Sequence, residues 1–230
     1  MRLMGRSMSR NGVLLGLFAV VTALLISITF TQTRDRIAIQ QRLSEERALL
    51  EILPGNSHDN SLLDDTLIAP AGDDLLRLPE PRPIYRARRD GAVTALIVPT
   101  RAADGYSGAI DMIVGVERSG SIAGVRVLNH RETPGLGDKI ERRKSDWITD
   151  FEGHSLAGTP APDWAVRKDG GRFDQFTGAT ITPRAVINAT RRALEYVAQE
   201  RTRLFDLPVE SEESSGSTQD APTTDIEAAQ

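Results

Sequence analysis

The sequence predicts an α+β domain behind one N-terminal membrane-spanning helix. An uncharged apolar run lies near the N-terminus, three segments with strand-like alternation follow in the middle of the chain, and an amphipathic helix comes after them. Because the strands are grouped and do not alternate strictly with helices, we expect antiparallel strands packed against helices. With 230 residues, 40% of them hydrophobic, the chain can build one core but is small for two full domains.

The apolar run covers residues 13–30 and contains no charged side chain. At a rise of ~1.5 Å per residue, a helix of this length just spans a hydrocarbon core of ~30 Å. The alternative is a cleaved signal peptide, since three arginines precede the run, but no small-x-small cleavage site follows it. We therefore expect residues 1–33 to form the N-terminus and a retained anchor. Arginines beyond the run balance those before it, so charge alone leaves the sidedness open.

Residues 34–83 connect the anchor to the domain. The first part, residues 34–53, is expected to leave the membrane as a solvated helical spacer that stops at a Pro-Gly pair. The second part, residues 54–83, is rich in Asp, Pro, Gly and Asn, which indicates a linker or an irregularly packed segment. The compact domain is expected to begin near Ile84 and to cover residues 84–207.

Within this domain, alternating patterns predict strands over residues 93–98, 109–116 and 122–128. A tight turn at Arg118-Ser119-Gly120 joins the last two strands into an antiparallel hairpin. Residues 138–151 fit a short helix. A second hairpin is expected from residues 164–168 and 172–176, because Asp-Gly-Gly separates them.

The final helix has clear start signals. Thr182 is a good N-cap and Pro183 a good first helical residue. The residues expected on its buried face recur at helical spacing: Val186, Thr190, Ala193, Leu194 and Val197. Beyond it, residues 208–230 contain no basic or aromatic side chain and should form a disordered acidic tail, to which we assign no role.

Composition excludes several classes of function. The net charge is −4 and the basic residues are scattered, so a nucleic-acid partner is not expected. Without cysteine, the chain has no disulfide, thiolate nucleophile or Cys-ligated cluster. Its three histidines, His58, His130 and His154, lack the spacing of a metal motif, so no metal site is expected either.

Two glycine-containing segments stand out, residues 130–139 and 174–183. The first contains Thr-Pro-Gly-Leu-Gly, which serves equally well as a plain turn between a strand and a helix. It lacks the pattern of a P-loop and of the dinucleotide fingerprint. The second contains Thr-Gly-Ala-Thr, which taken alone is more often a simple lead-in to a helix.

Thr180 is nevertheless an apt position for a phosphate. It lies just ahead of the predicted helix, where free N–H groups and the positive end of the helix dipole stabilise negative charge. Gly178 and Ala179 carry almost no side chain, so a bulky group can approach the backbone.

At these residues the sequence resembles the FMN-binding domain shared by the G subunit of the Rnf-type electron transport complex and the C subunit of the sodium-translocating NADH:quinone reductase. Thr177-Gly178-Ala179-Thr180 looks like the attachment motif of that family, and Glu132 to Gly137 looks like its second segment. With short similar stretches elsewhere and the anchor, the likeness covers most of the chain up to about residue 207 and favours the Rnf-type G subunit.

The resemblance implies that Thr180 holds FMN through a phosphoester. It also implies flavin contact for Thr177, Gly178 and Ala179, and for Glu132, Thr133, Leu136 and Gly137 in the second segment. Main-chain N–H groups of that glycine loop could tune the potential of the ring. Asp174 fits the acidic position that a flavin transferase recognises, with FAD as the donor.

The resemblance further implies a single-pass protein of the bacterial inner membrane, with a cytoplasmic N-terminus and a periplasmic FMN domain. Such a protein passes electrons between other members of an ion-translocating complex linked to ferredoxin and NAD, and turns over no substrate itself. Two other classes remain as alternatives. One is a cofactor-free, anchored scaffold. The other is a hydrolase that uses a Ser or Thr hydroxyl with His130 and Glu132, although the chain lacks the G-x-S-x-G elbow.

Overall fold

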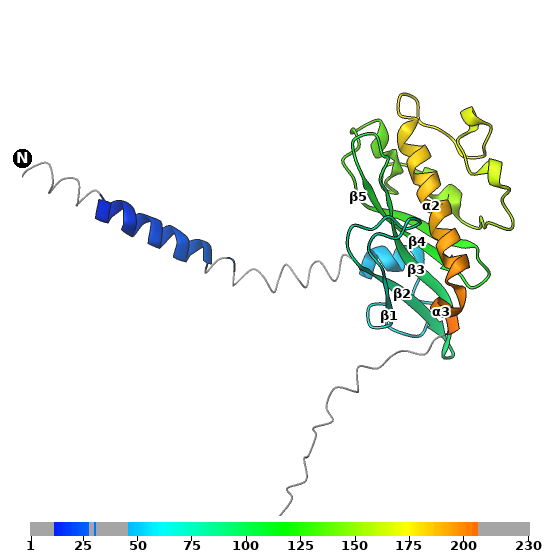
Figure 1. Ribbon diagram of the computed structural model, residues 1–230, viewed down its shortest axis with the longest axis horizontal. Coiled ribbons are helices and arrows are strands. Elements are labelled where there is room, and N and C mark those ends of the chain that lie inside the picture. Colours follow the sequence, from blue (N-terminus) through cyan, green and yellow to red (C-terminus); the bar gives the residue numbers. More distant parts are fainter. Residues whose placement is uncertain (1–11, 28–29, 31–45, 207–230) are drawn as a thin grey trace, which may run out of the picture.

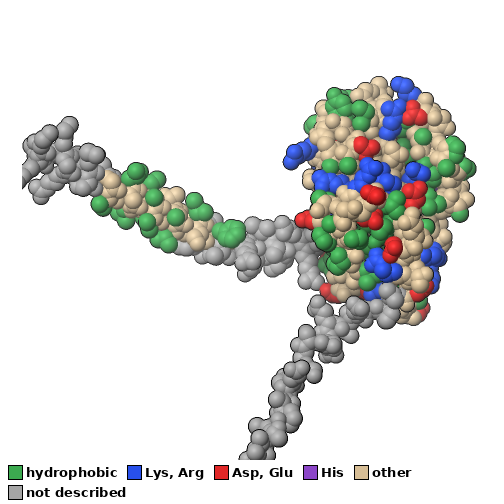
Figure 2. Space-filling view, viewed as in Figure 1, with side chains coloured by type: hydrophobic (Ala, Val, Ile, Leu, Met, Phe, Trp, Pro, Cys, Tyr) green, Lys and Arg blue, Asp and Glu red, His purple; other side chains and the backbone are tan. Residues whose placement is uncertain are grey.

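The computed structural model describes residues 12–27, 30 and 46–206. Residues 12–27 are helical, and their apolar side chains are exposed to solvent (Figure 2). Among the described residues, no helix has both the length and the hydropathy needed to cross a membrane. The predicted span, residues 13–30, includes positions 28 and 29, and these lie outside the described residues, as do residues 34–45 of the predicted spacer and the acidic tail.

The domain is built on one antiparallel sheet of five strands in sequential order (Figure 1). The strands are β1 (Thr66–Ala69), β2 (Arg82–Arg89), β3 (Ala92–Ala102), β4 (Ile110–Glu117) and β5 (Ile122–Asn129). The three strands predicted from alternation are β3, β4 and β5, and the turn at Arg118-Ser119-Gly120 joins the last two as expected. Helices α2 (Ile181–Gln199) and α3 (Arg201–Asp206) follow the sheet, which confirms the α+β class.

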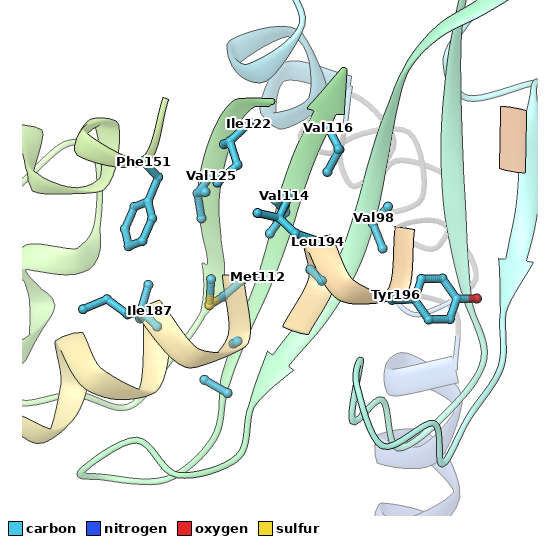
Figure 3. Packing of buried hydrophobic residues seen from close by; sticks show 14 of the residues in the cluster. Val98, Met112, Val114, Val116, Ile122, Val125, Phe151, Ile187, Leu194 and Tyr196 are labelled. Carbon is cyan, nitrogen blue, oxygen red and sulfur yellow. The ribbon is translucent and has the colours of Figure 1, made fainter. Parts of the chain in front are cut away.

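One face of the sheet carries the main core. Ile187 and Leu194 of α2 point toward Met112, Val114 and Val98 of the central strands (Figure 3). The five positions predicted for the buried face of this helix are all buried. Burial of a large apolar side chain contributes about 1.5–3 kcal/mol relative to its exposure, so this face supplies most of the driving force for folding.

The opposite face is covered by residues before Ile84. A helix over residues 46–52 and the segment after it bury Leu49, Ile52, Leu53 and Leu62 against Ile97 and Ile113. This end of the predicted spacer is therefore not solvated. Residues 54–83 are an irregularly packed segment, and they also supply the edge strand β1 and the buried Leu76 and Leu78.

Two predictions about the connections are wrong. Residues 138–151 form two separate 3-10 helices, η1 (Gly137–Ile140) and η2 (Asp146–Phe151), because Glu141 is extended and ends the first. The second hairpin is absent: Val166 and Phe173 form only an isolated parallel bridge. Its residues instead place Trp164 and Phe173 in an aromatic cluster with Phe151, whose ring stacks on Phe173 with centroids 4.5 Å apart.

The start of the final helix also differs from the prediction. Helix α2 begins at Ile181, so its N-cap is Thr180 and not Thr182, and Pro183 is the third helical residue. Proline is tolerated in the first turn because its missing N–H has no acceptor there. The early start places the Thr-Gly-Ala-Thr segment directly against the helix.

Candidate functional site

The Thr-Gly-Ala-Thr segment forms a tight turn that leads into α2. The Ala179 N–H donates to the Phe176 carbonyl at 3.1 Å, and Gly178 lies in the left-handed region at φ 84°. A residue with a side chain would be strained at that position, so glycine is required for the turn. Thr177 and Gly178 are exposed at its tip, and Ala179 and Thr180 are partly buried where the helix begins.

The Thr180 hydroxyl does not cap the helix. A threonine at the N-cap usually adopts an extended backbone and accepts a hydrogen bond from the first helical turn. Thr180 instead has φ −78° and ψ −26°, and its side chain makes no capping bond. Thr180 is thus a partly buried N-cap residue whose hydroxyl is not used as a cap.

The end of α2 next to this hydroxyl is positive and carries no acidic side chain of its own. No acidic residue lies in the first helical turn, although acidic residues are common there in other helices. Arg184, the fourth helical residue, donates from Nε to Asp169 at 2.6 Å. Because the first N–H groups of a helix lack intrahelical acceptors, this end can stabilise an anionic group such as a phosphate.

The second glycine segment forms a turn of its own. The Thr133 carbonyl accepts the N–H groups of both Leu136 and Gly137 at 3.1 Å. Pro134 and Gly135, with φ 81° at the glycine, occupy the central positions as in a type II turn. Asp138 stabilises the turn, because its Oδ1 accepts the Gly135 N–H at 2.8 Å.

The structure brings the two segments together. A Cβ placed on Gly178 would lie 3.6 Å from Cδ2 of Leu136, so the tip of one turn contacts the side chain of the other. Deeper in the domain, the Thr182 hydroxyl donates to Glu132 Oε2 at 2.5 Å. Positions fifty residues apart in the sequence thus form one site.

The residues assigned to this site differ in their exposure. Leu136, Thr133 and Thr177 are exposed. Glu132 and Gly137 are buried. Two further apolar side chains are exposed near these segments: Ile181 at the start of α2, and Tyr106 in the loop whose Ser107 N–H binds Glu132.

Two aromatic side chains pack beneath the turn over residues 177–180. Trp147 Nε1 donates to the Asp174 carbonyl at 2.8 Å, and the Trp147 ring meets that of Phe176 edge to face at 5.0 Å. Trp147 is buried, which holds the lead-in to the turn in place. The Asp174 side chain itself is exposed and pairs with Arg167 at 3.1 Å.

His130 has a structural position. Its Nδ1 accepts the backbone N–H of Glu132 at 3.0 Å, and its Nε2 lies 2.9 Å from Glu141 Oε1. With Nδ1 accepting, the proton sits on Nε2 and points to the carboxylate. A hydrogen bond from Arg143, followed by that of His130, keeps the pKa of Glu141 below its usual value. Both ring nitrogens are bound by groups other than a hydroxyl, so the geometry does not support the hydrolase alternative.

The sequence did not single out Thr182 and Ser107 as parts of the site. Thr182 was expected to cap the helix, and the signal for its role is only visible once Glu132 lies beside it. Over residues 12–27, 30 and 46–206, no cluster of three or more acidic or histidine side chains could hold a metal ion.

Comparison with known proteins identifies the domain that contains these two segments. Residues 105–195 match the model of the FMN-binding domain, and residues 1–52 match that of the RnfG N-terminal region. The chain is 52% identical over 202 residues to the G subunit of the ion-translocating oxidoreductase complex of Pseudomonas aeruginosa, covering 87% of this chain and 93% of that protein.

Two further relatives carry the same name. The protein of Shewanella loihica is 45% identical over 91% of this chain and 98% of its own length, and that of Vibrio cholerae is 45% identical over 86% and 94%. The region that matches the FMN-binding domain includes both of the segments that meet beside Thr180. The chain therefore belongs to the family of G subunits of the Rnf-type ion-translocating oxidoreductase complex, and it contains that family's FMN-binding domain.

Proposed function

We propose that this chain is the electron-carrying G subunit of a membrane-bound, ion-translocating complex and holds FMN as a phosphoester on Thr180. The observation that carries this proposal is the Thr180 hydroxyl, which lies at the positive end of α2 and makes no capping bond. The family assignment supports an FMN-binding role for the same domain. When bound, FMN would supply reversible electron transfer, and the chain's own residues hold and orient it.

The residues around Thr180 have distinct tasks in this proposal. Gly178 and Ala179 leave space for the phosphate and for the enzyme that delivers it. The N–H groups at the start of α2 offset the phosphodiester charge. Residues 177–180 form the attachment turn. Thr177 lies in this turn and Leu136 lies beside it, so both are placed to contact the ring system, and Thr133 and Gly137 shape the loop that carries Leu136.

Attachment would proceed without any change in oxidation state. Thr180 Oγ forms a bond to the flavin-side phosphorus of FAD, the phosphoanhydride bond breaks, AMP leaves with the bridging oxygen, and the hydroxyl proton is released. A flavin transferase would catalyse this step, and the exposed Asp174 is the acidic residue that it would recognise. A covalent tether suits an electron relay, because the carrier keeps a fixed distance to donor and acceptor in either redox state.

The proposal includes the location of the protein. Residues 13–30 would anchor the chain in the inner membrane as a single span, with residues 1–12 cytoplasmic and the FMN domain periplasmic. Its partners would be the other members of a complex that exchanges electrons between reduced ferredoxin and NAD while it moves ions. The relatives are named as subunits of an ion-translocating oxidoreductase complex, which supports a place for this chain in such a complex.

Intact mass of the full chain, purified after co-expression with a flavin transferase, tests the proposal. The expected gain is one FMN less one water, with flavin fluorescence that stays on the polypeptide in a denaturing gel. Thr180→Val should lose both signals, and Thr202→Val, at an exposed threonine of α3 outside both glycine segments, should keep them. An unmodified wild-type chain would favour a cofactor-free scaffold, and covalent flavin on Thr180→Val would overturn the choice of residue.

A further inference from the structure

We propose that Glu132 and Thr182 form a buried positioning pair, which sets the attachment turn against the glycine loop from inside the domain. Glu132 would therefore not be a flavin contact. This inference rests on the proposed function, since it says how the chain holds Thr180 ready for FMN.

The environment of Glu132 supports an internal role. The residue is 4% exposed, and each carboxylate oxygen has its own partner inside the domain. Oε1 accepts the Ser107 N–H at 3.0 Å, and Oε2 accepts the Thr182 hydroxyl at 2.5 Å. A side chain with both oxygens turned inward and so little exposed surface has no face left for a ring that binds at the surface.

The pair joins three separate segments. Ser107 belongs to the loop after β3, Glu132 opens the glycine loop, and Thr182 lies in the first turn of α2. Thr182 lies in the first turn of α2, two residues after the N-cap Thr180, so a shift of the backbone at Thr182 also moves Thr180. The Glu132 carboxylate therefore fixes the glycine loop and the start of α2 relative to each other.

Glycines keep the space around the carboxylate open. A Cβ on Gly137 would lie 2.8 Å from Glu132 Oε2 and 3.0 Å from Thr182 Oγ1. A Cβ on Gly105 would lie 2.3 Å from the Gly108 carbonyl and 3.0 Å from Glu132 Oε1. These distances are shorter than ordinary van der Waals contact, so only glycine fits at either position. The backbone at Gly137 and at Gly105 therefore packs against the carboxylate from two sides and restricts its position.

Glu132 carries a charge and Thr182 does not, so mutations can separate the effect of the charge from the effect of the position. An ionised carboxylate only accepts hydrogen bonds. In Glu132→Gln, the amide oxygen can face the Ser107 N–H and the amide nitrogen can face Thr182, whose hydroxyl can accept instead of donate. Glu132→Gln thus keeps the geometry and removes the charge. Thr182→Val keeps the shape and leaves a buried carboxylate oxygen unsatisfied.

The experiment uses the full chain co-expressed with a flavin transferase. Thr182→Val should lower the rate of covalent flavin incorporation, followed by intact mass, about tenfold, the factor that ~1.4 kcal/mol of lost positioning produces. Thr182→Ser restores the hydroxyl and should return the rate toward wild type, and Glu132→Gln should stay close to it. Iodide should quench the flavin that Thr182→Val does carry more than it quenches wild type, because the tether is less fixed.

A control separates positioning from loss of stability. Gly115→Ala changes the far face of the sheet, and should destabilise the domain without slowing incorporation. If Thr182→Val incorporates flavin at the wild-type rate with unchanged quenching, the positioning pair is wrong. The same holds if Glu132→Gln slows incorporation as much as Thr182→Val does, since its amide keeps both hydrogen bonds.

Failure of the proposed function would look different. If the wild-type chain carries no FMN, the pair can still be measured in the unmodified protein by hydrogen exchange of the amides in residues 177–184. Faster exchange in Thr182→Val than in Thr182→Ser supports the pair, and equal exchange in the two variants overturns it.

Discussion

The side chain of Ile52 packs directly on the backbone of Gly115 in β4. A Cβ at Gly115 would lie 2.2 Å from Ile52 Cγ2, and Gly124, the partner of Gly115 across the strands, lies under the same isoleucine. The glycine pair thus forms a shallow seat on the sheet for the helix over residues 46–52. This contact joins the chain that follows the predicted anchor to the strands of the FMN domain.

Gly115→Ala should lower the free energy of unfolding by about 1–3 kcal/mol, because the added methyl forces Ile52 out of its seat. Gly124→Ala is the matched variant, since its Cβ would meet Ile52 at an ordinary distance of 3.5 Å. It should cost much less, and urea unfolding measures both. Equal losses in the two variants would show that the seat on Gly115 has no special role.

Asp65→Asn should destabilise the domain by about 3–5 kcal/mol, since it removes the carboxylate of a buried ion pair. Asp65 Oδ1 accepts from Arg86 Nε at 2.6 Å, Arg86 is fully buried, and Arg88 binds the other oxygen. Asp169→Asn breaks the exposed pair with Arg184 and should cost far less, because water and salt screen the attraction between exposed charges. Thermal unfolding of both variants checks the contrast, and a large loss for Asp169→Asn would contradict it.

Trp147→Phe should loosen the attachment turn with modest loss of stability. The ring contact with Phe176 is retained, but the hydrogen bond to the Asp174 carbonyl is lost, which costs about 1–3 kcal/mol for a buried group left unpaired. Amide exchange at residues 174–180 should become faster. The control is Trp164→Phe. Trp164 Nε1 donates to the Thr159 carbonyl, away from the turn, so amide exchange at residues 174–180 should not change in this variant.

Stability should fall as the pH drops below about 6.5 because of His154. Burial, and then the nearby Arg172, lower the pKa of His154 in the folded protein below its ordinary value. The unfolded chain therefore binds the proton more readily than the folded protein. The stability that neutral His154 contributes is complete above about pH 6.5, and it is lost as the pH falls toward the pKa of the folded state.

The pH dependence of unfolding between about pH 5 and 7.5 tests the role of His154. This window lies above the range of Glu141 and Asp169, whose hydrogen bonds to arginines lower their pKa values below the ordinary ones. His154→Gln should flatten the slope in this window. A slope as steep as that of wild type would assign the proton to another group.

Much of the domain could be predicted from local pattern. Strands β3, β4 and β5 and the buried face of α2 follow from periodicity, because alternate burial in a strand and 3.6-residue burial in a helix select the side chains directly. The regions that were predicted wrongly, residues 138–151 and 164–176, have weak periodicity. There, packing of aromatic side chains such as Phe151 and Phe173 outweighs local preference.

The two site segments could be found in the chain without coordinates, because turn glycines ahead of a helix are local features. It was the resemblance to the FMN-binding domain that singled out Thr180 among the threonines of the second segment. How these segments meet could not be found in this way. The contact between Glu132 and Thr182, and the seat of Ile52 on Gly115, join residues that are 50 or more positions apart. No local propensity encodes such pairings; they are fixed when the sheet pairs in register and buries both of its faces.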